Sequence, residues 1–162
     1  MKIEENVQGL DEDEKSEEIT LISGDGIKFP IQVKFATISK VVKSTLEQTE
    51  DIESGLLLSS VKGKSLKFIV DYMNHHKGKE PPIIKLPLSS TDMSKECEDP
   101  WDAAFIDSFD NKMQSTYDLL KAANYMNIPV LLHLVAAKIG SLIKGKSRSQ
   151  VCKILNPEND KL

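Results

Sequence analysis

The feature that most constrains the fold of this chain is an apolar segment in its C-terminal part, which follows Pro129 and runs to about Ile143. Asn127 is a suitable N-cap and Pro129 suits a first helical turn, so the sequence predicts a helix over 129–143. Apolar residues cover nearly its whole circumference: Val130, Leu131, Leu132, Leu134, Val135, Ala136, Ala137, Ile139, Leu142 and Ile143. A helix that is apolar all round is normally buried on all sides.

Little of the chain follows this helix to cover it. A short helix is predicted over 149–155, where Val151, Ile154 and Leu155 supply one apolar stripe before Pro157. This stripe cannot cover both faces of the preceding helix, and soluble monomers seldom expose large apolar patches. We therefore expect a surface that binds a partner protein, and self-association of the chain, as a homodimer, when that partner is missing.

The composition favours a single globular domain. The chain has 162 residues, of which 40% are apolar and 28% charged, enough for one core without metal or disulfide support. Cys97 and Cys152 have no partner spacing and favour a reducing compartment, so we expect a cytoplasmic and nuclear protein. The longest apolar run, Val130 to Ala137, is too short to cross a bilayer, and the first residues do not resemble a signal peptide. We expect neither a secreted nor a membrane protein.

The charge is unevenly distributed along the chain. Residues 1–18 carry eight acidic residues and two lysines, a local charge of −6, so the remaining chain sums to +2 against the total of −4. An acidic, aromatic-free segment cannot bury enough surface to offset its ordering entropy, and residues 1–17 are predicted to be a disordered tail. The nearly neutral remainder is not typical of a nucleic-acid-binding protein.

The first half of the chain predicts a hairpin and two helices. Ile19–Ile22 and Ile27–Phe29 flank Asp25-Gly26, and glycine readily adopts the positive φ that such a turn needs. Pro30 has no N–H group to donate and belongs at a strand end or a sheet edge. Apolar spacing and turn residues predict three further elements: a helix over 33–46, a buried strand at 56–58 and a helix over 65–76.

The second half is predicted to be helical after a long connection. Residues 77–99 are rich in proline, serine and charge and exceed the usual loop length, so we expect a flexible loop there. Residues 83–86 can add a short strand within it. Helices over 101–109 and 115–126 then precede the two C-terminal helices.

Residues 140–147 match the phosphate-loop pattern G-x-x-x-x-G-K-[ST]. A phosphate-binding loop connects a strand to a helix, whereas the segment before this pattern is predicted to be a helix. A helix that stops at Gly145, with Lys144 and Lys146 near its negative end, accounts for the same residues. Nucleotide binding through this segment is the alternative from a different functional class.

Histidine and cysteine residues do not form a recognisable site in the sequence. His75 and His76 are adjacent, Cys97 lies in the predicted loop, and no second pair with metal-ligand spacing accompanies them. His133 is expected to be packed in the core or in an interface. No nucleophile–base pattern is present, so we expect no metal, no cofactor and no enzymatic activity.

Five sequence blocks, spread from about residue 19 to 156, are the most distinctive motifs of the chain. They are Ile19–Gly26 with Phe29, Asn74–Lys77 with Pro81-Pro82, Trp101-Asp102 with Phe105, Ala122–Ile128, and Ile143–Lys146. In the same order, they resemble blocks of the Skp1 family, the adaptors of SCF (Skp1–cullin–F-box) ubiquitin ligases. The last block resembles the family's Ile-Lys-Gly-Lys sequence, which explains the phosphate-loop match as a coincidence.

The resemblance implies a mixed fold of helices and strands, α/β in the broad sense and α+β in the narrower one. It predicts a BTB/POZ fold over 18–128, with a small three-stranded sheet and clustered helices, and a C-terminal helical extension over 129–162. In the family, the BTB/POZ part binds the N-terminal helices of a cullin and the C-terminal helices bind F-box proteins, without catalysis. The family's cullin-contacting Asn-Tyr pair falls on Asn124 and Tyr125. The F-box side falls on seven apolar residues: Val135, Ile139, Leu142, Ile143, Val151, Ile154 and Leu155.

The chain departs from the family pattern in several places. Residues 83–88 are more apolar than the acidic loop typical there, and Ser147–Gln150 replaces the usual Thr-Pro-Glu-Glu. Family members continue beyond the position of Leu162 with an acidic stretch and a helix, so the F-box-binding region is expected to be truncated. Elongin C, a related BTB adaptor, is the runner-up, but the Trp101 segment and the helices after Ile128 favour Skp1.

Overall fold

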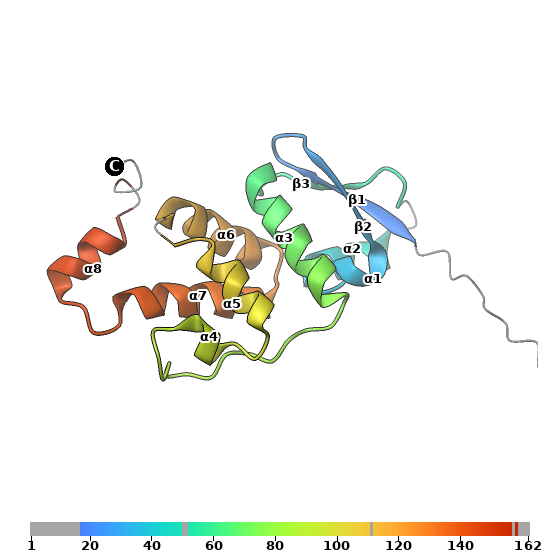
Figure 1. Ribbon diagram of the computed structural model, residues 1–162. Coiled ribbons are helices and arrows are strands. Elements are labelled where there is room, and N and C mark those ends of the chain that lie inside the picture. The colour runs from blue at the N-terminus through green and yellow to red at the C-terminus, as the bar shows by residue number, and fades with distance from the viewer. Residues whose placement is uncertain (1–16, 50–51, 111, 157, 159–162) are drawn as a thin grey trace, which may run out of the picture.

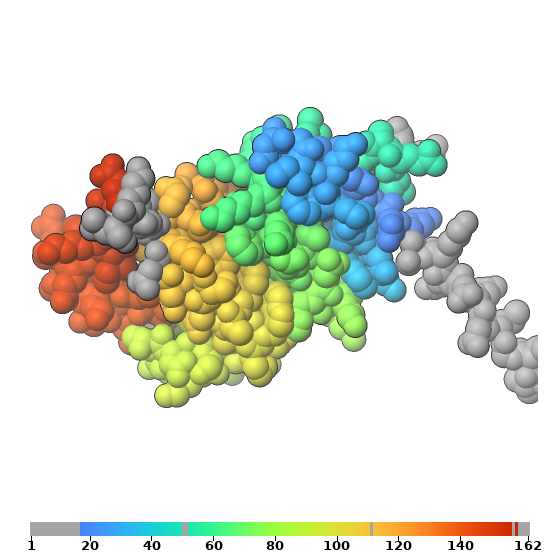
Figure 2. All heavy atoms as spheres, turned by 45° about the horizontal axis from the view of Figure 1, so that its top comes forward, coloured from blue at the N-terminus to red at the C-terminus, as the bar shows by residue number. Residues whose placement is uncertain are grey.

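The computed structural model describes residues 17–49, 52–110, 112–156 and 158 (Figure 1). The predicted acidic tail therefore lies outside the described residues, except for Glu17. A three-stranded sheet lies at one end of the molecule together with the first two short helices, and the last helix lies at the other end, with the longer helices between them (Figures 1 and 2). This arrangement confirms the predicted α+β class with a small three-stranded sheet.

The sheet has the strand order β2-β1-β3. β1 (Glu18–Ser23) pairs antiparallel with β2 (Lys28–Gln32) and parallel with β3 (Leu56–Leu58). Gly26 in the predicted hairpin turn has a φ of 82°, which glycine adopts without strain. Pro30 lies in the edge strand β2, where a missing N–H group is tolerated, as predicted.

The prediction of a single helix over 33–46 is wrong, because the structure has two helices, α1 (Val33–Ala36) and α2 (Lys40–Gln48). Ser39 separates them. Its backbone is extended, and its hydroxyl accepts a hydrogen bond from the Val42 amide, so it caps the second helix. Serine favours caps over helix interiors because its side chain competes for backbone hydrogen bonds. The spacing of apolar residues gives no sign of this competition and therefore does not predict the break between the two helices.

The core lies where the longer helices meet the sheet. Helix α3 (Gly63–His76) contacts β1, β2 and α6 (Met113–Tyr125), while α7 (Pro129–Ile143) contacts α5 (Pro100–Asp107), α6 and α8 (Arg148–Ile154). These elements together bury large side chains that include Leu21, Leu58, Leu66, Tyr72, Ile106, Leu119 and Leu131. The helices predicted in these regions are confirmed, with end positions shifted by a few residues.

Residues 77–99 connect α3 to α5. They contain a short helix, α4 (Met93–Glu96), which is not predicted from the sequence. The Asp92 carboxylate caps this helix by accepting a hydrogen bond from the Ser94 amide at 3.1 Å. The short strand expected at 83–86 is not formed, since these residues have no regular secondary structure.

The prediction that Asn127 caps α7 is also wrong. Asn127 ends α6 in the left-handed conformation, with a φ of 51°, which asparagine adopts more readily than most residues. Its amide donates to the Asn124 carbonyl at 3.1 Å, and the Ile128 amide donates to the Ala123 carbonyl at 3.0 Å. These two bonds define a Schellman helix end. Ile128 then takes the N-cap position of α7 without a side-chain bond.

Helix α7 is not buried on all sides by the chain, as expected from the small amount of chain that follows it. His133 is exposed, so it does not pack in the core, and its placement in an interface stays a prediction. Lys138 is buried instead, with its ammonium group 2.7 Å from the Asp107 carboxylate and 2.6 Å from that of Asp110. Burial lowers the pKa of Lys138, but the hydrogen bonds to both carboxylates outweigh it and raise the pKa. Within the described ranges, no helix has the length and apolar character needed to cross a membrane.

Ser39 is expected to contribute strongly to stability because it joins α2 to the end of α6. It is fully buried, and its hydroxyl donates to the Met126 carbonyl at 2.6 Å. Ser39→Ala removes this bond and the cap of α2, so we expect the free energy of unfolding to fall by about 2 kcal/mol in urea denaturation. The control is Ser44→Ala, since Ser44 is exposed and bonds the Val41 carbonyl of its own helix. Equal losses in the two variants would contradict this role.

Candidate protein interface

The two predicted cullin-contact residues form an exposed corner at the end of α6. Tyr125 is the last residue of this helix and is 40% exposed, and Asn124 beside it is exposed as well. The Schellman bonds fix the backbone of the corner. The amide of Lys40, at the start of α2, also donates to the Asn127 carbonyl at 3.2 Å. The structure therefore presents both side chains together on an ordered backbone.

This corner has the chemistry of a protein-binding site. A tyrosine combines a large apolar ring with a hydroxyl group and loses little side-chain entropy on binding, which is why tyrosine is enriched at interfaces. The Asn124 amide adds two hydrogen-bond donors and an acceptor. We define Asn124 and Tyr125 as the α6 corner.

Six of the seven predicted F-box-contact residues are half-buried and lie toward the end of the molecule opposite the sheet (Figure 2). We call them the α7–α8 surface: Ile139, Leu142, Ile143, Val151, Ile154 and Leu155. On each helix the three residues follow i, i+3, i+4 spacing and lie on one helical face. Helix α8 has no fully buried residue, so its apolar side chains are incompletely covered by the chain.

Helix α8 is held by hydrogen bonds at both of its ends. Ser147 and Gln150 form a capping box, in which the Gln150 amide donates to the Ser147 hydroxyl and the Ser147 amide donates to the Gln150 side chain. At the other end, the Tyr117 hydroxyl of α6 donates to the Leu155 carbonyl at 2.9 Å. The capping box fixes where α8 begins, and the Tyr117 bond ties the end of α8 to α6.

The seventh predicted residue, Val135, is fully buried in the core. It packs on the inner face of α7, so its assignment to the partner-facing side is corrected. The apolar pattern could not separate the two faces because it covers nearly the whole helix.

The segment 140–147 does not have the geometry of a phosphate loop. It consists of the end of α7, a short connection in which Gly145 has a φ of 73°, and the cap of α8. A helix therefore stands where a phosphate loop requires a strand.

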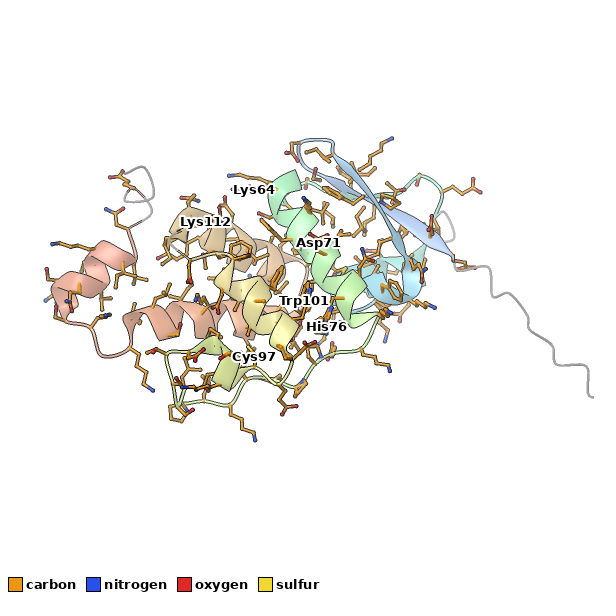
Figure 3. The ribbon with its side chains drawn as sticks, in the orientation of Figure 1. Lys64, Asp71, His76, Cys97, Trp101 and Lys112 are labelled. Atoms are coloured by element: carbon orange, nitrogen blue, oxygen red, sulfur yellow. The ribbon has the colours of Figure 1, made fainter. Side chains whose placement is uncertain are left out.

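A further cluster joins the end of α3 to the start of α5, and it is not predicted as a unit from the sequence. His75 Nε2 lies 2.7 Å from Asp99 Oδ2, and His76 Nε2 lies 2.8 Å from Asp102 Oδ1. The Trp101 ring stacks on that of His75 with centroids 4.0 Å apart, and Figure 3 shows Trp101 close to His76. The hydrogen bond from His75 is the main cause that lowers the pKa of Asp99. The only sequence signal was that both blocks resemble family motifs.

The metal-binding and nucleophilic capacity of this cluster can be judged from its contacts. Ligand atoms of His75, His76 and Asp99 lie within 4.8 Å of one another. Each of these side chains is engaged in a histidine–carboxylate hydrogen bond, so we interpret the group as a structural connection. Burial, with a smaller effect of the Asp102 carboxylate, raises the pKa of the nearby Cys97 thiol to about 11, which makes it a weak nucleophile at neutral pH.

Comparison with known proteins identifies relatives over nearly the whole chain. The model of the "Skp1 family, tetramerisation domain" matches residues 17–78. The chain is 33% identical over 148 residues to the S-phase kinase-associated protein 1 homolog of Tetrahymena thermophila, covering 91% of this chain and 87% of the relative. It is 31% identical over 142 residues to the E3 ubiquitin ligase complex SCF subunit sconC of Arthroderma otae, which covers 88% of this chain and 84% of the relative. It is also 29% identical over 145 residues to SKP1-like protein 9 of Arabidopsis thaliana, covering 90% and 87%.

These matches agree with the architecture of the molecule. The family model spans the sheet and α1 to α3, and the relatives extend the similarity into the C-terminal helices. The small three-stranded sheet with its clustered helices fits the predicted BTB/POZ fold. This chain belongs to the Skp1 family.

Proposed function

We propose that the chain is a Skp1-type adaptor subunit of an SCF E3 ubiquitin ligase. It bridges a cullin scaffold to F-box substrate receptors and so supports ubiquitin-dependent protein degradation. The observation that carries this proposal is the presence of two separate partner-type surfaces, the α6 corner and the α7–α8 surface, on one ordered chain. The names of the relatives, a Skp1 homolog and an SCF subunit, support the same role.

The α6 corner is the proposed cullin-binding site. Tyr125 provides the apolar anchor and Asn124 the hydrogen-bonding groups, and binding to the N-terminal helices of a cullin would cover both. Large aromatic side chains of this kind supply much of the free energy at protein interfaces. The rigid helix end reduces the entropy lost on binding, because the backbone is already ordered.

The α7–α8 surface is the proposed F-box-binding site. Its six half-buried apolar side chains lie on two consecutive helices and gain further burial when a partner helix packs against them. Burial of apolar area contributes about 25 cal/mol per Å². The buried Lys138 pairs α7 with the end of α5 and helps to keep the surface in position.

Two alternative functions fit less well. An elongin C-like adaptor would account for the sheet and the α6 corner, but the match to the Tetrahymena relative covers 91% of the chain and extends beyond Ile128. Nucleotide binding through 140–147 is not favoured because a helix precedes this segment.

The proposed adaptor acts without catalysis, metal or cofactor, and binds neither nucleic acid nor membranes. The nearly neutral charge of residues 19–162 supports the exclusion of nucleic acid. We further propose a cytoplasmic and nuclear location, which the two unpaired cysteines support.

The cullin site is tested by Tyr125→Ala. This change removes the proposed anchor and should weaken binding to a cullin N-terminal domain by about 2 kcal/mol or more, as measured by isothermal titration calorimetry. Tyr125→Phe is the matched control, which keeps the ring and should retain most of the affinity. Both variants should have the melting temperature of the parent protein because Tyr125 is exposed. An unchanged dissociation constant for Tyr125→Ala would remove the α6 corner from the cullin site.

The F-box site is tested by placing a charge on α8. Ile154→Asp would force a carboxylate into an apolar contact and should weaken binding to an F-box peptide at least tenfold, with cullin binding unchanged. Cys152→Asp introduces the same charge at an exposed position of the same helix and should have little effect. Both variants are titrated with the F-box peptide and with the cullin domain. Equal affinities of Ile154→Asp and Cys152→Asp for the F-box peptide would refute the placement of the F-box site on α8.

The same surface should cause the free protein to self-associate, as soluble proteins tend to cover large apolar patches. Light scattering across a concentration series should show a growing average mass for the parent protein and a smaller increase for Ile154→Asp. A strict monomer at every concentration would show that the α7–α8 surface is too small to drive association.

A further inference from the structure

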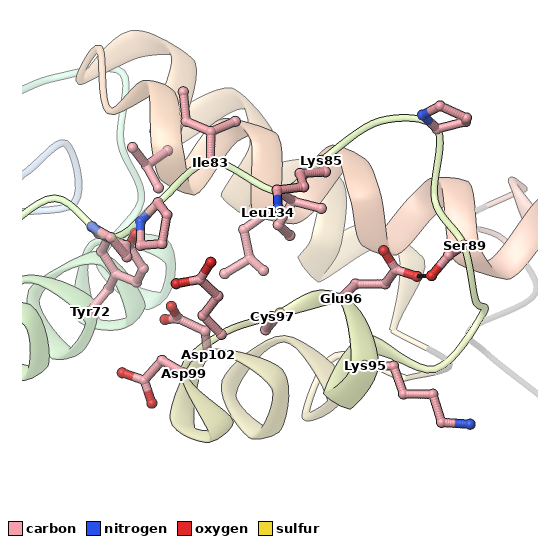
Figure 4. A pocket seen from close by; sticks show the side chains of 16 residues that line it. Tyr72, Ile83, Lys85, Ser89, Lys95, Glu96, Cys97, Asp99, Asp102 and Leu134 are labelled. Atoms are coloured by element: carbon pink, nitrogen blue, oxygen red, sulfur yellow. Dashed lines mark hydrogen bonds between the residues drawn. The ribbon is translucent and has the colours of Figure 1, made fainter.

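A pocket of about 320 Å³ lies between the end of α3, residues 81–87, the α4–α5 region and α7 (Figure 4). Pro82, Ile84 and Leu134 contribute to its apolar side. Its volume is near the lower limit for ligand pockets, which span about 300–1,000 Å³. It therefore suits a single side chain better than a nucleotide or another large ligand. The proposed cullin and F-box sites use none of the residues that line it.

The hydroxyl of Tyr72 is the unusual feature of this pocket. Tyr72 lines the pocket and is fully buried, and its hydroxyl has no hydrogen-bond partner among the residues that the structure describes. Buried hydroxyl groups normally have a partner. Burial, with a smaller effect of the Asp102 carboxylate, raises the pKa of Tyr72. The hydroxyl therefore stays protonated and can both donate and accept a hydrogen bond.

The charge of the pocket is predominantly negative. Four acidic residues and two lysines line it: Glu96, Glu98, Asp99 and Asp102 against Lys85 and Lys95. The ammonium group of Lys95 points away from Tyr72 in Figure 4 and lies 3.8 Å from the Asp92 carboxylate. Carboxylates in a partly enclosed site attract a cation and repel an anion.

Hydrogen bonds hold two of the lining carboxylates in fixed positions, and the Asp99 carboxylate points away from the interior of the pocket in Figure 4. Asp99 accepts a hydrogen bond from the Trp101 amide and pairs with His75. Asp102 pairs with His76, and the centroids of the His76 and Tyr72 rings are 4.4 Å apart. An ionised carboxylate has about four lone-pair positions, so these groups retain the capacity to accept further hydrogen bonds. Fixed acceptors reduce the entropy that a ligand loses on binding.

We propose that this pocket binds one arginine side chain of a partner protein. Its guanidinium group donates to the Tyr72 hydroxyl and to the Asp102 carboxylate, while Asp99 adds to the negative charge of the site. A guanidinium has five N–H donors in one plane and can reach several acceptors at once, whereas an ammonium group is a compact point charge. A guanidinium is also more weakly hydrated, which favours its transfer into a partly enclosed pocket. The apolar side of the pocket packs against the methylene groups of the arginine side chain.

The proposal can be tested with the intact chain because Trp101 is its only tryptophan and lies beside Tyr72, with ring centroids 6.4 Å apart. Titration with N-acetylargininamide should change the Trp101 fluorescence saturably, and the neutral isostere N-acetylcitrullinamide should not. Tyr72→Phe should weaken arginine binding about tenfold, as expected for the loss of a hydrogen bond to a charged group.

The matched control is Tyr117→Phe, which removes a hydroxyl that has a partner, the Leu155 carbonyl. It should lower the melting temperature and leave arginine binding unchanged, whereas Tyr72→Phe should keep or raise the melting temperature. The proposal is overturned by the absence of a saturable response, by an equal response to citrulline, or by equal affinity of Tyr72→Phe. It is also overturned if the melting temperature falls by the same amount in both variants, because the Tyr72 hydroxyl would then already have a hydrogen-bond partner in the folded protein.

Discussion

The hydrogen bonds at the end of α6 connect most of the features that matter for function. Asn127 in the left-handed conformation closes the helix, and the buried Ser39 hydroxyl binds the Met126 carbonyl from α2. Backbone groups in such a place must be paired because their burial without partners is unfavourable. The pairing found here leaves Tyr125 exposed and sets the direction in which α7 begins. Both proposed protein-binding surfaces therefore depend on one short, fully bonded turn.

A second connection, between α3 and α5, acts independently of the first. The chain between these helices is long, and the two histidine–aspartate pairs and the stacked Trp101 bring its ends together. The same contacts position two of the aspartates that line the pocket, Asp99 and Asp102. This part of the molecule thus combines a structural role with side chains suited to bind a cationic group.

Much of the fold could be predicted from local patterns, and the errors have identifiable physical causes. The hairpin at Gly26, the edge position of Pro30 and the helices of the second half follow from backbone chemistry and apolar spacing. The break at Ser39 was missed because the apolar spacing continues across it. The role of Asn127 was misassigned because asparagine favours both an N-cap and a left-handed helix end.

The sequence by itself determined the order of the elements, the resemblance to the Skp1 family, and the helices that carry the proposed interfaces, α6 for one and α7 with α8 for the other. These features depend on residues close together in the chain. Only the tertiary structure decided that Val135 faces the core while Ile139 stays half-buried, and that Lys138 is buried between carboxylates. It also decided that Tyr72 lines a pocket and that its hydroxyl finds no hydrogen-bond partner among the described residues. These outcomes depend on contacts between distant segments, and an apolar pattern that surrounds a helix does not indicate which face meets them.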